Sequence, residues 1–298
     1  MTGDAHLHFF SRGVFGDLAR QVEALAAAPD PAAAAIERLG VEPPPHEPEA
    51  LAARWSAELD RHGVERALLF GSAPGEAETV ARAVRARPDR FAAAQMLNPR
   101  APGAAAAPER FAALGLRGIL LLPALHELFP DDPACLPIYE AAARLRLVVI
   151  VSIGPLRIPV RERLGLAAGH PRYGDPARLA AVIERHPGVP FVVPHFGCGL
   201  LEALLAGRAA PRNLFLDTSG SNAWRGEAGL ASVFRHALDR LGSERLLFGT
   251  DSTVFPRGWR REVHDAQLAA LDELGAAASE RAAILGGNLA RLLSDSWS

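Results

Sequence analysis

Cysteine, methionine and tyrosine are scarce in this chain, which contains two residues of each. Two thiols, Cys135 and Cys198, cannot form the disulfide framework of a small secreted protein, so a reducing cytoplasm is the expected location. The longest apolar runs, such as residues 147–153, are far shorter than the ~20 residues that cross a bilayer. The first residues also lack the basic start and apolar core of a signal peptide.

An excess of charge of either sign is also missing. The net charge is −2 and the isoelectric point is about 6.6, with no basic stripe for nucleic acid and no polybasic segment for a membrane surface. With 298 residues, 49% of them hydrophobic, the chain can bury a large core. We therefore expect a globular protein whose partner is a small-molecule substrate.

What the chain does contain is a repeated alternation of short apolar runs and Ala/Leu-rich stretches. The runs cover residues 3–9, 64–70, 90–97, 116–122, 147–153, 189–195, 213–218 and 245–251. Near-continuous apolar runs are typical of parallel strands that are buried on both faces. An open doubly wound sheet would show a similar pattern, but eight repeats with polar residues at several strand ends favour a (β/α)8 TIM barrel of the α/β class.

No linker or change in composition divides the chain, so residues 1–298 are expected to form one domain. Residues 10–62 are expected to form a helical insertion between strands 1 and 2. This insertion would cover the barrel mouth or contribute to an interface, and a homo-oligomer is therefore a possibility that the sequence leaves open.

The first predicted strand contains His6-Leu7-His8. Side chains alternate between the faces of a strand, so both imidazoles point the same way and can chelate one metal ion. The strand that ends at residue 195 places His195 at the barrel mouth, and the last strand places Asp251 there. Taken singly, each has an ordinary explanation: packed or surface histidines, a histidine at a helix start, and an aspartate that caps a helix. Taken together, they predict a single polar site.

These segments resemble a known family. The sequences DAHLHFF, PFVVPHFG, LFLDTSG, LLFGTDS and ILGGNLARLL are similar to the amidohydrolase-2 family of the amidohydrolase superfamily, in order over almost the whole chain and most weakly at residues 10–62. The family includes hydrolases, lactonases, hydratases and non-oxidative decarboxylases. The resemblance implies that His6, His8, His195 and Asp251 are metal-site or catalytic residues, with Asp251 next to both the metal and the reactive water.

The chain departs from the family pattern at the fifth strand, where Ser152 stands in place of the usual histidine ligand. The fourth strand, residues 118–122, is wholly apolar and offers no bridging Lys or Glu, so a single divalent metal ion, most simply zinc, is expected. His126 or His170 could take the missing position or bind substrate. Each is also explained as a solvated loop histidine.

The expected activity is metal-dependent hydrolysis of a small carboxylated or cyclic substrate by activated water. Asp251 would move the proton and His195 would polarise the scissile carbonyl. Arg157 and neighbouring loop arginines could meet an anionic substrate, and Phe9, Phe10 and Trp224 could wall the pocket. Three alternatives remain: a non-oxidative decarboxylase, a metal-free lactonase, and a catalytically degenerate barrel that binds a ligand, for which Ser152 is the reason.

Overall fold

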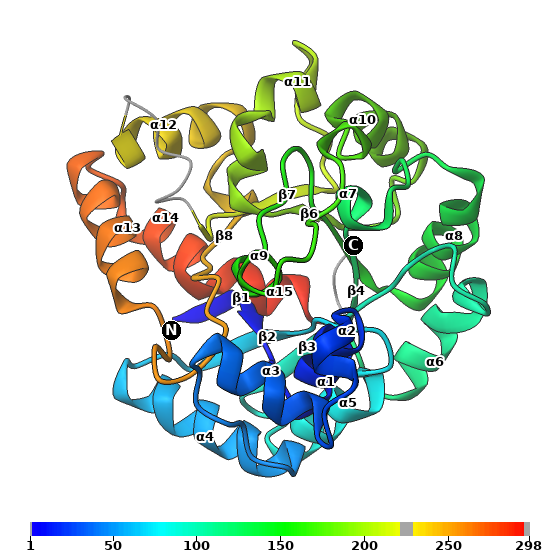
Figure 1. Ribbon diagram of the computed structural model, residues 1–298. Helices are drawn as coiled ribbons and strands as arrows, with labels where there is room; N and C mark the ends of the chain where they lie inside the picture. Colours follow the sequence, from blue (N-terminus) through cyan, green and yellow to red (C-terminus); the bar gives the residue numbers. More distant parts are fainter. Residues whose placement is uncertain (1, 221–228, 295–298) are drawn as a thin grey trace.

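The computed structural model describes residues 2–220 and 229–294, and its eight parallel strands follow one another around a central barrel (Figure 1). The strands are β1 Gly3–His8, β2 Arg66–Gly71, β3 Phe91–Met96, β4 Gly118–Leu121, β5 Val148–Val151, β6 Phe191–Val193, β7 Leu214–Asp217 and β8 Leu246–Leu247. Backbone hydrogen bonds close the ring: Ala5 N–H donates to Phe248 O (2.8 Å) and Asp251 N–H donates to His6 O (3.0 Å). All eight predicted strands and the (β/α)8 barrel are confirmed.

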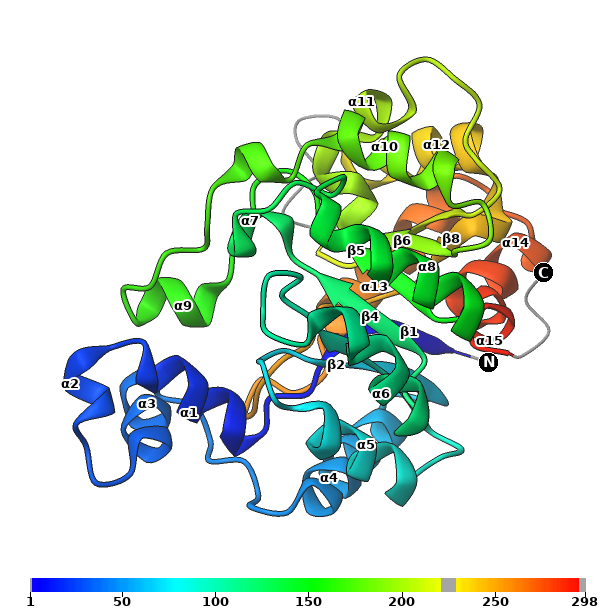
Figure 2. The ribbon, with the colours of Figure 1, turned by 90° about the vertical axis from the view of Figure 1, so that its right-hand side faces the viewer.

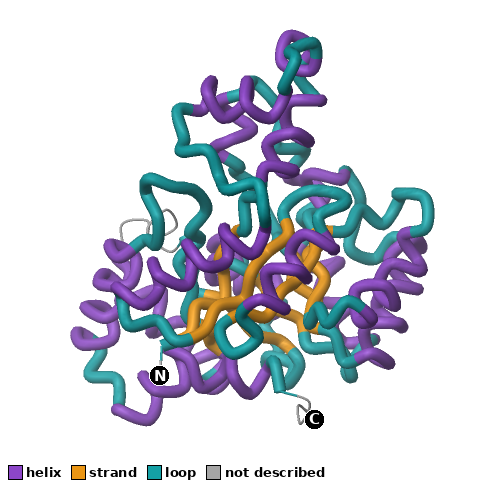
Figure 3. The backbone as a smooth tube through the Cα atoms, turned by 90° about the horizontal axis from the view of Figure 1, so that it is seen from below, coloured by secondary structure: helices purple, strands orange, loops and turns teal. Residues whose placement is uncertain are grey.

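Helices surround the strands (Figure 3). The outer ring contains α4 Pro48–Arg61, α5 Ala77–Ala86, α6 Ala107–Ala113, α8 Leu136–Leu145, α10 Pro176–Arg185, α11 Leu201–Leu205, α12 Gly229–Leu241 and α13 Arg261–Glu273, followed by α14 Ala278–Ala282, the π-helical turn η7 Ala283–Gly287 and α15 Asn288–Leu292. Shorter pieces are α7 Pro123–His126, α9 Pro159–Arg163 and the 3-10 turns η1 Ala104–Ala106, η2 Pro133–Cys135, η3 Pro171–Tyr173, η4 His195–Gly199 and η6 Ser243–Arg245. Local signals place these elements: Asp175, for example, caps the first turn of α10 by accepting hydrogen bonds from Ala177 N and Arg178 N.

The hydrophobic core has two layers. Side chains such as Leu68, Ile150 and Phe215 fill the inside of the barrel, while Leu69, Val149 and others pack between the strands and the outer helices. This double burial explains why the strands read as continuous apolar runs. Cys135 and Cys198 are both buried and free, in keeping with the absence of a disulfide framework.

Helices α1 Arg12–Arg20, α2 Glu23–Ala26 and α3 Pro31–Leu39 project beyond the barrel (Figure 2, lower left). They share a small core of their own, to which Leu18, Leu25 and Ile36 contribute, together with Leu164 from the segment after β5. The remaining helix of the expected insertion, α4, lies in the outer ring beside α5 (Figure 1). The projecting part of the molecule is therefore residues 12–39.

The segment after β5, which carries α9, reaches back toward the projecting helices (Figure 2). Arg161 Nη1 donates to Gln21 Oε1 at 2.9 Å, and Val160 and Leu166 pack against the same small core. Two extensions that are far apart in sequence thus meet beyond the mouth of the barrel. In the described residues, no helix has the length and apolar character needed to cross a membrane.

Candidate active site

A cavity of about 700 Å³ opens at the carboxyl ends of the strands. Its floor includes His6, His8, His195 and Asp251, and its outer wall comes from α1 and the α9 segment. This is the end of a TIM barrel at which active sites are built, because the loops that follow the strands converge there.

Three atoms that could bind a metal ion meet at the floor. His6 Nε2 lies 3.2 Å from His8 Nε2 and 3.6 Å from Asp251 Oδ1, and His8 Nε2 lies 3.3 Å from the same oxygen. Ligand atoms at the corners of a tetrahedron are about 3.3–3.4 Å apart when the bonds to the ion are ~2.0–2.1 Å. Two imidazole nitrogens and one carboxylate oxygen at this spacing fit one divalent cation.

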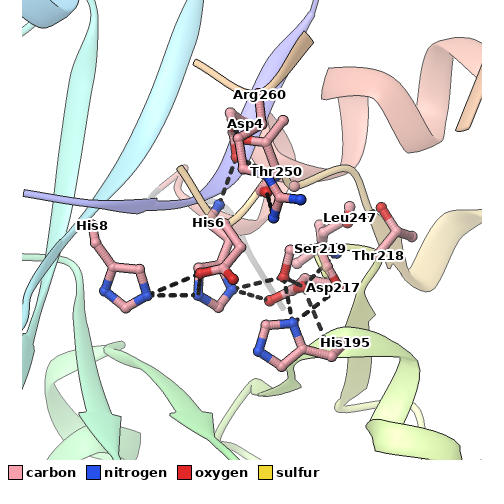
Figure 4. A network of polar contacts seen from close by, with 12 residues as sticks. Asp4, His6, His8, His195, Asp217, Thr218, Ser219, Leu247, Thr250 and Arg260 are labelled. Carbon is pink, nitrogen blue, oxygen red and sulfur yellow. Dashed lines mark hydrogen bonds and ion pairs between the residues drawn. The ribbon is translucent and has the colours of Figure 1, made fainter. Parts of the chain in front are cut away.

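Hydrogen bonds on the far side of each imidazole orient it, and Figure 4 shows those of His6. His6 Nδ1 lies 2.8 Å from Asp217 Oδ2, and a carboxylate can only accept, so the hydrogen of neutral His6 is on Nδ1 and the lone pair of Nε2 faces the floor. His8 Nδ1 lies 2.6 Å from Ser72 Oγ, whose own hydrogen can go to Phe70 O at 3.1 Å. Histidine ligands of metals usually have such a second partner. With these tautomers, the lone pairs of His6 Nε2, His8 Nε2 and Asp251 Oδ1 face one another. A cation between them would bind all three.

His195 lies beside His6, with ring centroids 5.0 Å apart. Its Nδ1 lies 2.9 Å from the carbonyl oxygen of Ser219, which leaves Nε2 as the acceptor, and its backbone N–H donates to Asp217 Oδ1 at 3.2 Å. His195 and Asp251 both adopt left-handed backbone conformations, with φ of 58° each. Non-glycine residues in this region are uncommon and concentrate at functional sites, where the surrounding structure holds them.

The charges of the site stabilise a positive charge between the carboxylates. Burial lowers the pKa of His6, but Asp217 and Asp251 outweigh it and hold that pKa above its usual value. Burial lowers the pKa of His8. Burial also acts to raise the pKa of Asp251, but the hydrogen bond with His8 and the charge of His6 hold it well below its usual range. Asp251 is therefore an ionised carboxylate, as a metal ligand or a proton acceptor must be.

A model of the amidohydrolase family matches residues 4–294. The chain belongs to this family. The family-level resemblance drawn from the sequence is confirmed, and the protein is an enzyme of the amidohydrolase family. No curated protein matches this amidohydrolase in a direct comparison.

Solved structures share the fold of this amidohydrolase at low sequence identity. The 5-carboxyvanillate decarboxylase from Sphingomonas paucimobilis has 21% identity and a TM-score of 0.66, with 98% of each chain covered. The 5-carboxyvanillate decarboxylase from Novosphingobium aromaticivorans, in complex with manganese and 4-hydroxy-3-methoxy-5-nitrobenzoic acid, has 17% identity and a TM-score of 0.65, covering 98% of this chain and 96% of that one. The "probable 2-pyrone-4,6-dicarboxylic acid hydrolase" from Acinetobacter baumannii, with citric acid bound, has 16% identity and a TM-score of 0.65, with 98% of each chain covered.

The structure brings some of the remaining predicted site residues to the cavity and leaves others outside it. Ser152, His126 and Arg157 line the cavity of this amidohydrolase together with the floor residues. Arg157 is exposed and forms an ion pair with Glu162 at 3.1 Å. His170 is exposed, is not among the cavity-lining residues and accepts a hydrogen bond from Arg172 N at the start of η3, so the structure does not bring it to the site. Phe10 lines the cavity, Phe9 is buried in the core, and Trp224 lies outside the described residues.

Sequence reasoning assigned no role to Asp217 and Ser219, although both stand in the segment LFLDTSG that carries the family resemblance. Both are fully buried, and Ser219 Oγ donates to Asp217 Oδ1 and lies 2.9 Å from His6 Nδ1. The sequence did contain a signal for them, because Asp217 and Ser219 stand at the carboxyl end of a predicted strand, where a barrel places its site residues. Ser72, after β2, was also missed because a lone serine carries no such signal.

The chain contains no lysine at any position. A two-metal site bridged by a modified lysine is therefore excluded on composition, in agreement with the apolar fourth strand. Two groups of side chains have ligand atoms close enough together to hold one ion: His6, His8 and Asp251, and His6, His195 and Asp217. We favour the first group, because in the second Nδ1 of His6 already lies 2.8 Å from Asp217 and Nδ1 of His195 lies 2.9 Å from the carbonyl oxygen of Ser219.

Proposed function

We propose that this amidohydrolase is a metal-dependent hydrolase that acts on a small carboxylated or cyclic substrate. The observation that carries the proposal is the convergence of His6 Nε2, His8 Nε2 and Asp251 Oδ1 within 3.6 Å of one another on the floor of a large cavity. His6 and His8 come from β1 and Asp251 from the loop after β8, so closure of the barrel brings these three ligand atoms to one point.

In this proposal His6, His8 and Asp251 hold one divalent cation. When bound, such a cation lowers the pKa of an adjacent water molecule and polarises a substrate oxygen. Asp251 accepts the proton of the attacking water and returns it to the leaving group, for which its ionised state is required. His195, with Nδ1 donating to Ser219 O, turns Nε2 toward the cavity as an acceptor, so it orients the attacking water rather than polarising the scissile carbonyl.

A non-oxidative decarboxylase is the second candidate. It is supported by the similarity to two proteins named 5-carboxyvanillate decarboxylase. On the same floor, Asp251 would first take up a proton from a water molecule and then deliver it to the ring carbon that loses carbon dioxide, which leaves hydroxide to combine with the released carbon dioxide. A metal-free lactonase and a ligand-binding barrel without turnover are the remaining alternatives, because Ser152 stands where a further ligand is expected.

The metal assignment is tested by elemental analysis of protein purified without chelator, beside the double variant His6→Ala/His8→Ala. The His170→Ala variant is the matched control, because this exposed histidine lies outside the cavity. We expect about one equivalent of metal in the wild type and the control, and a loss of most of it in the double variant. Zinc is the predicted metal, and manganese is tested beside it because one similar structure contains it. Equal, negligible metal in all three proteins would exclude the metal assignment.

The reaction type is tested by following carbon dioxide release and ester or lactone hydrolysis on the same preparation. Hydroxybenzoates form the decarboxylation panel, and small lactones and carboxylated esters form the hydrolysis panel. Carbon dioxide release without hydrolysis would replace the first proposal by the second. A lack of turnover on both panels by metal-loaded protein would favour the ligand-binding barrel. A cytoplasmic location and a homo-oligomer remain predictions.

A further inference from the structure

The wall of the cavity is rich in arginine. Five arginines line it, against two carboxylates, Asp17 and Asp251; the arginines are Arg157, Arg161, Arg163, Arg257 and Arg260. If Asp251 serves as a metal ligand, its charge is already balanced by the ion. An excess of positive charge in a cavity with low-dielectric walls attracts anions and raises their local concentration.

Arg257 is distinguished by its position and by its partners. It lies on the loop after β8 that also carries Asp251, whereas Arg157, Arg161 and Arg163 belong to the α9 segment on the outer wall. Within the part of the chain that the structure describes, no carboxylate lies within ion-pair distance of Arg257. Its one hydrogen bond there is from Nη2 to Thr253 Oγ1, at 2.8 Å.

Arg260, which shares the loop, is held more firmly. Its Nε donates to Glu262 Oε1 at 2.9 Å, its Nη1 donates to Thr250 O at 3.3 Å, and its backbone N–H donates to Ser252 Oγ at 3.0 Å. Thr250 and Ser252 are fully buried on either side of Asp251. Arg260 is therefore hydrogen-bonded directly to the residues on both sides of Asp251, which presents its carboxylate to the cavity floor.

The charges of these residues act on one another. Partial burial lowers the pKa of Arg257, the charge of Arg260 lowers it further, and the charges of Asp251 and Glu262 oppose both. Arg260 already pairs with Glu262, whereas Arg257 has no carboxylate partner among the described residues, so an anion in the cavity would balance the charge of Arg257. A guanidinium group with free donors binds a carboxylate through two parallel hydrogen bonds.

We propose that Arg257, supported by Arg260, binds a carboxylate group of the substrate beside the reaction centre. The proposal deepens the proposed function, on which it rests, by naming the loop after β8 as the element that selects anionic substrates. The arginines of the α9 segment then contribute to the general attraction of anions rather than to this contact.

The test is isothermal titration of the wild type and the Arg257→Gln variant with benzoate, isophthalate and citrate. Benzamide serves as the uncharged counterpart of benzoate. The matched control is Arg261→Gln, because Arg261 lies close by in the chain but is 72% exposed, pairs with Asp265 and does not line the cavity. Each titration is carried out on metal-free and on manganese-loaded protein, after a thermal melt confirms that both variants are folded.

We expect Arg257→Gln to weaken carboxylate binding by roughly 10- to 100-fold, as expected for a lost charge-assisted pair, without changing benzamide binding. Arg257→Lys is expected to retain part of the affinity. Equal affinities of Arg257→Gln and Arg261→Gln would overturn the proposal, as would failure of all three carboxylates to bind more tightly than benzamide. Charge selectivity that survives in metal-free protein separates this result from the metal assignment, which the elemental analysis tests independently.

Discussion

Asp217 Oδ2 lies 2.8 Å from Nδ1 of His6, and the other oxygen of the same carboxylate accepts hydrogen bonds from the backbone N–H groups of His195 and Ser219. One fully buried carboxylate on β7 therefore joins the imidazole of β1 to the turn after β6. It orients the lone pair of His6 Nε2 toward the floor of the cavity. Asp217 is a positioning residue, since it acts through His6 and His195.

Asp217→Asn keeps the shape of the side chain but weakens its ability to accept the hydrogen of His6. We expect metal affinity to fall by roughly 10- to 100-fold, the usual effect of removing the partner of a histidine ligand. The measurement is a metal titration, combined with nitrogen NMR of the His6 ring to follow the hydrogen on Nδ1. The control is Asp265→Asn, which removes an exposed carboxylate. Unchanged affinity and an unchanged His6 tautomer would contradict the positioning role.

Ser152 lines the cavity at the end of β5, where the family pattern predicts a histidine ligand. Ser152→His is expected to tighten metal binding by about tenfold or more, which corresponds to ~1.4 kcal/mol, because a fourth protein ligand is added. Ser152→Asn is the control for polarity without an imidazole. If both variants bind metal as the wild type does, residue 152 does not reach the metal position.

Gly220 permits the close packing of His195. A Cβ atom at this residue would lie 2.8 Å from His195 Nδ1, and its φ of +59° disfavours other residues. Gly220→Ala is expected to lower turnover by up to ~100-fold, the effect of a misplaced catalytic group. Gly207→Ala is the matched control: its φ is +73°, but nothing lies within 4 Å of the added atom. Turnover is measured on the substrate that the panels identify, and equal turnover in the two variants would refute the prediction.

His126 introduces a pH dependence of stability. Burial, with a smaller contribution from the charge of Arg161, lowers its pKa to about 4, and its buried Nδ1 has no hydrogen-bond partner among the described residues. In the unfolded chain this imidazole takes up a proton below a pH of about 6.5, whereas the folded protein does not, so stability is lost as pH falls from about 6.5 toward 4.

The His126→Gln variant is expected to lose less stability on acidification than the wild type. The measurement is the urea midpoint at several pH values across this window, and the quantity compared is the slope, since the substitution also changes packing. His170→Gln corrects for the removal of one imidazole from the surface. If the urea midpoint of His126→Gln changes with pH as steeply as that of the wild type, the His126 imidazole takes up a proton equally well in the folded and the unfolded protein, and the prediction is wrong.

The barrel could be predicted from the sequence because its signals are local. Each strand is a continuous apolar run, and polar residues follow the strands at the end where a barrel builds its site. For the same reason His6, His8, His195 and Asp251 could be assigned to one rim before any coordinates were known. Their approach within 3.6 Å was implied by closure of the sheet between the first and last strands.

Other features depended on contacts between distant segments. His170 and His126 look alike in the sequence, but the packing of α7 and η3 places only His126 at the cavity. The partners of His6, the meeting of α1 with the α9 segment, and the presence of Arg257 and Asp251 on one cavity depend on contacts that no local pattern encodes. The sequence by itself determined the fold and the family, and it supplied the candidate site residues, since these depend on the period of burial and on residue type. The tertiary structure decided their orientation and their partners, because hydrogen-bond geometry is set by how loops from different strands pack against one another.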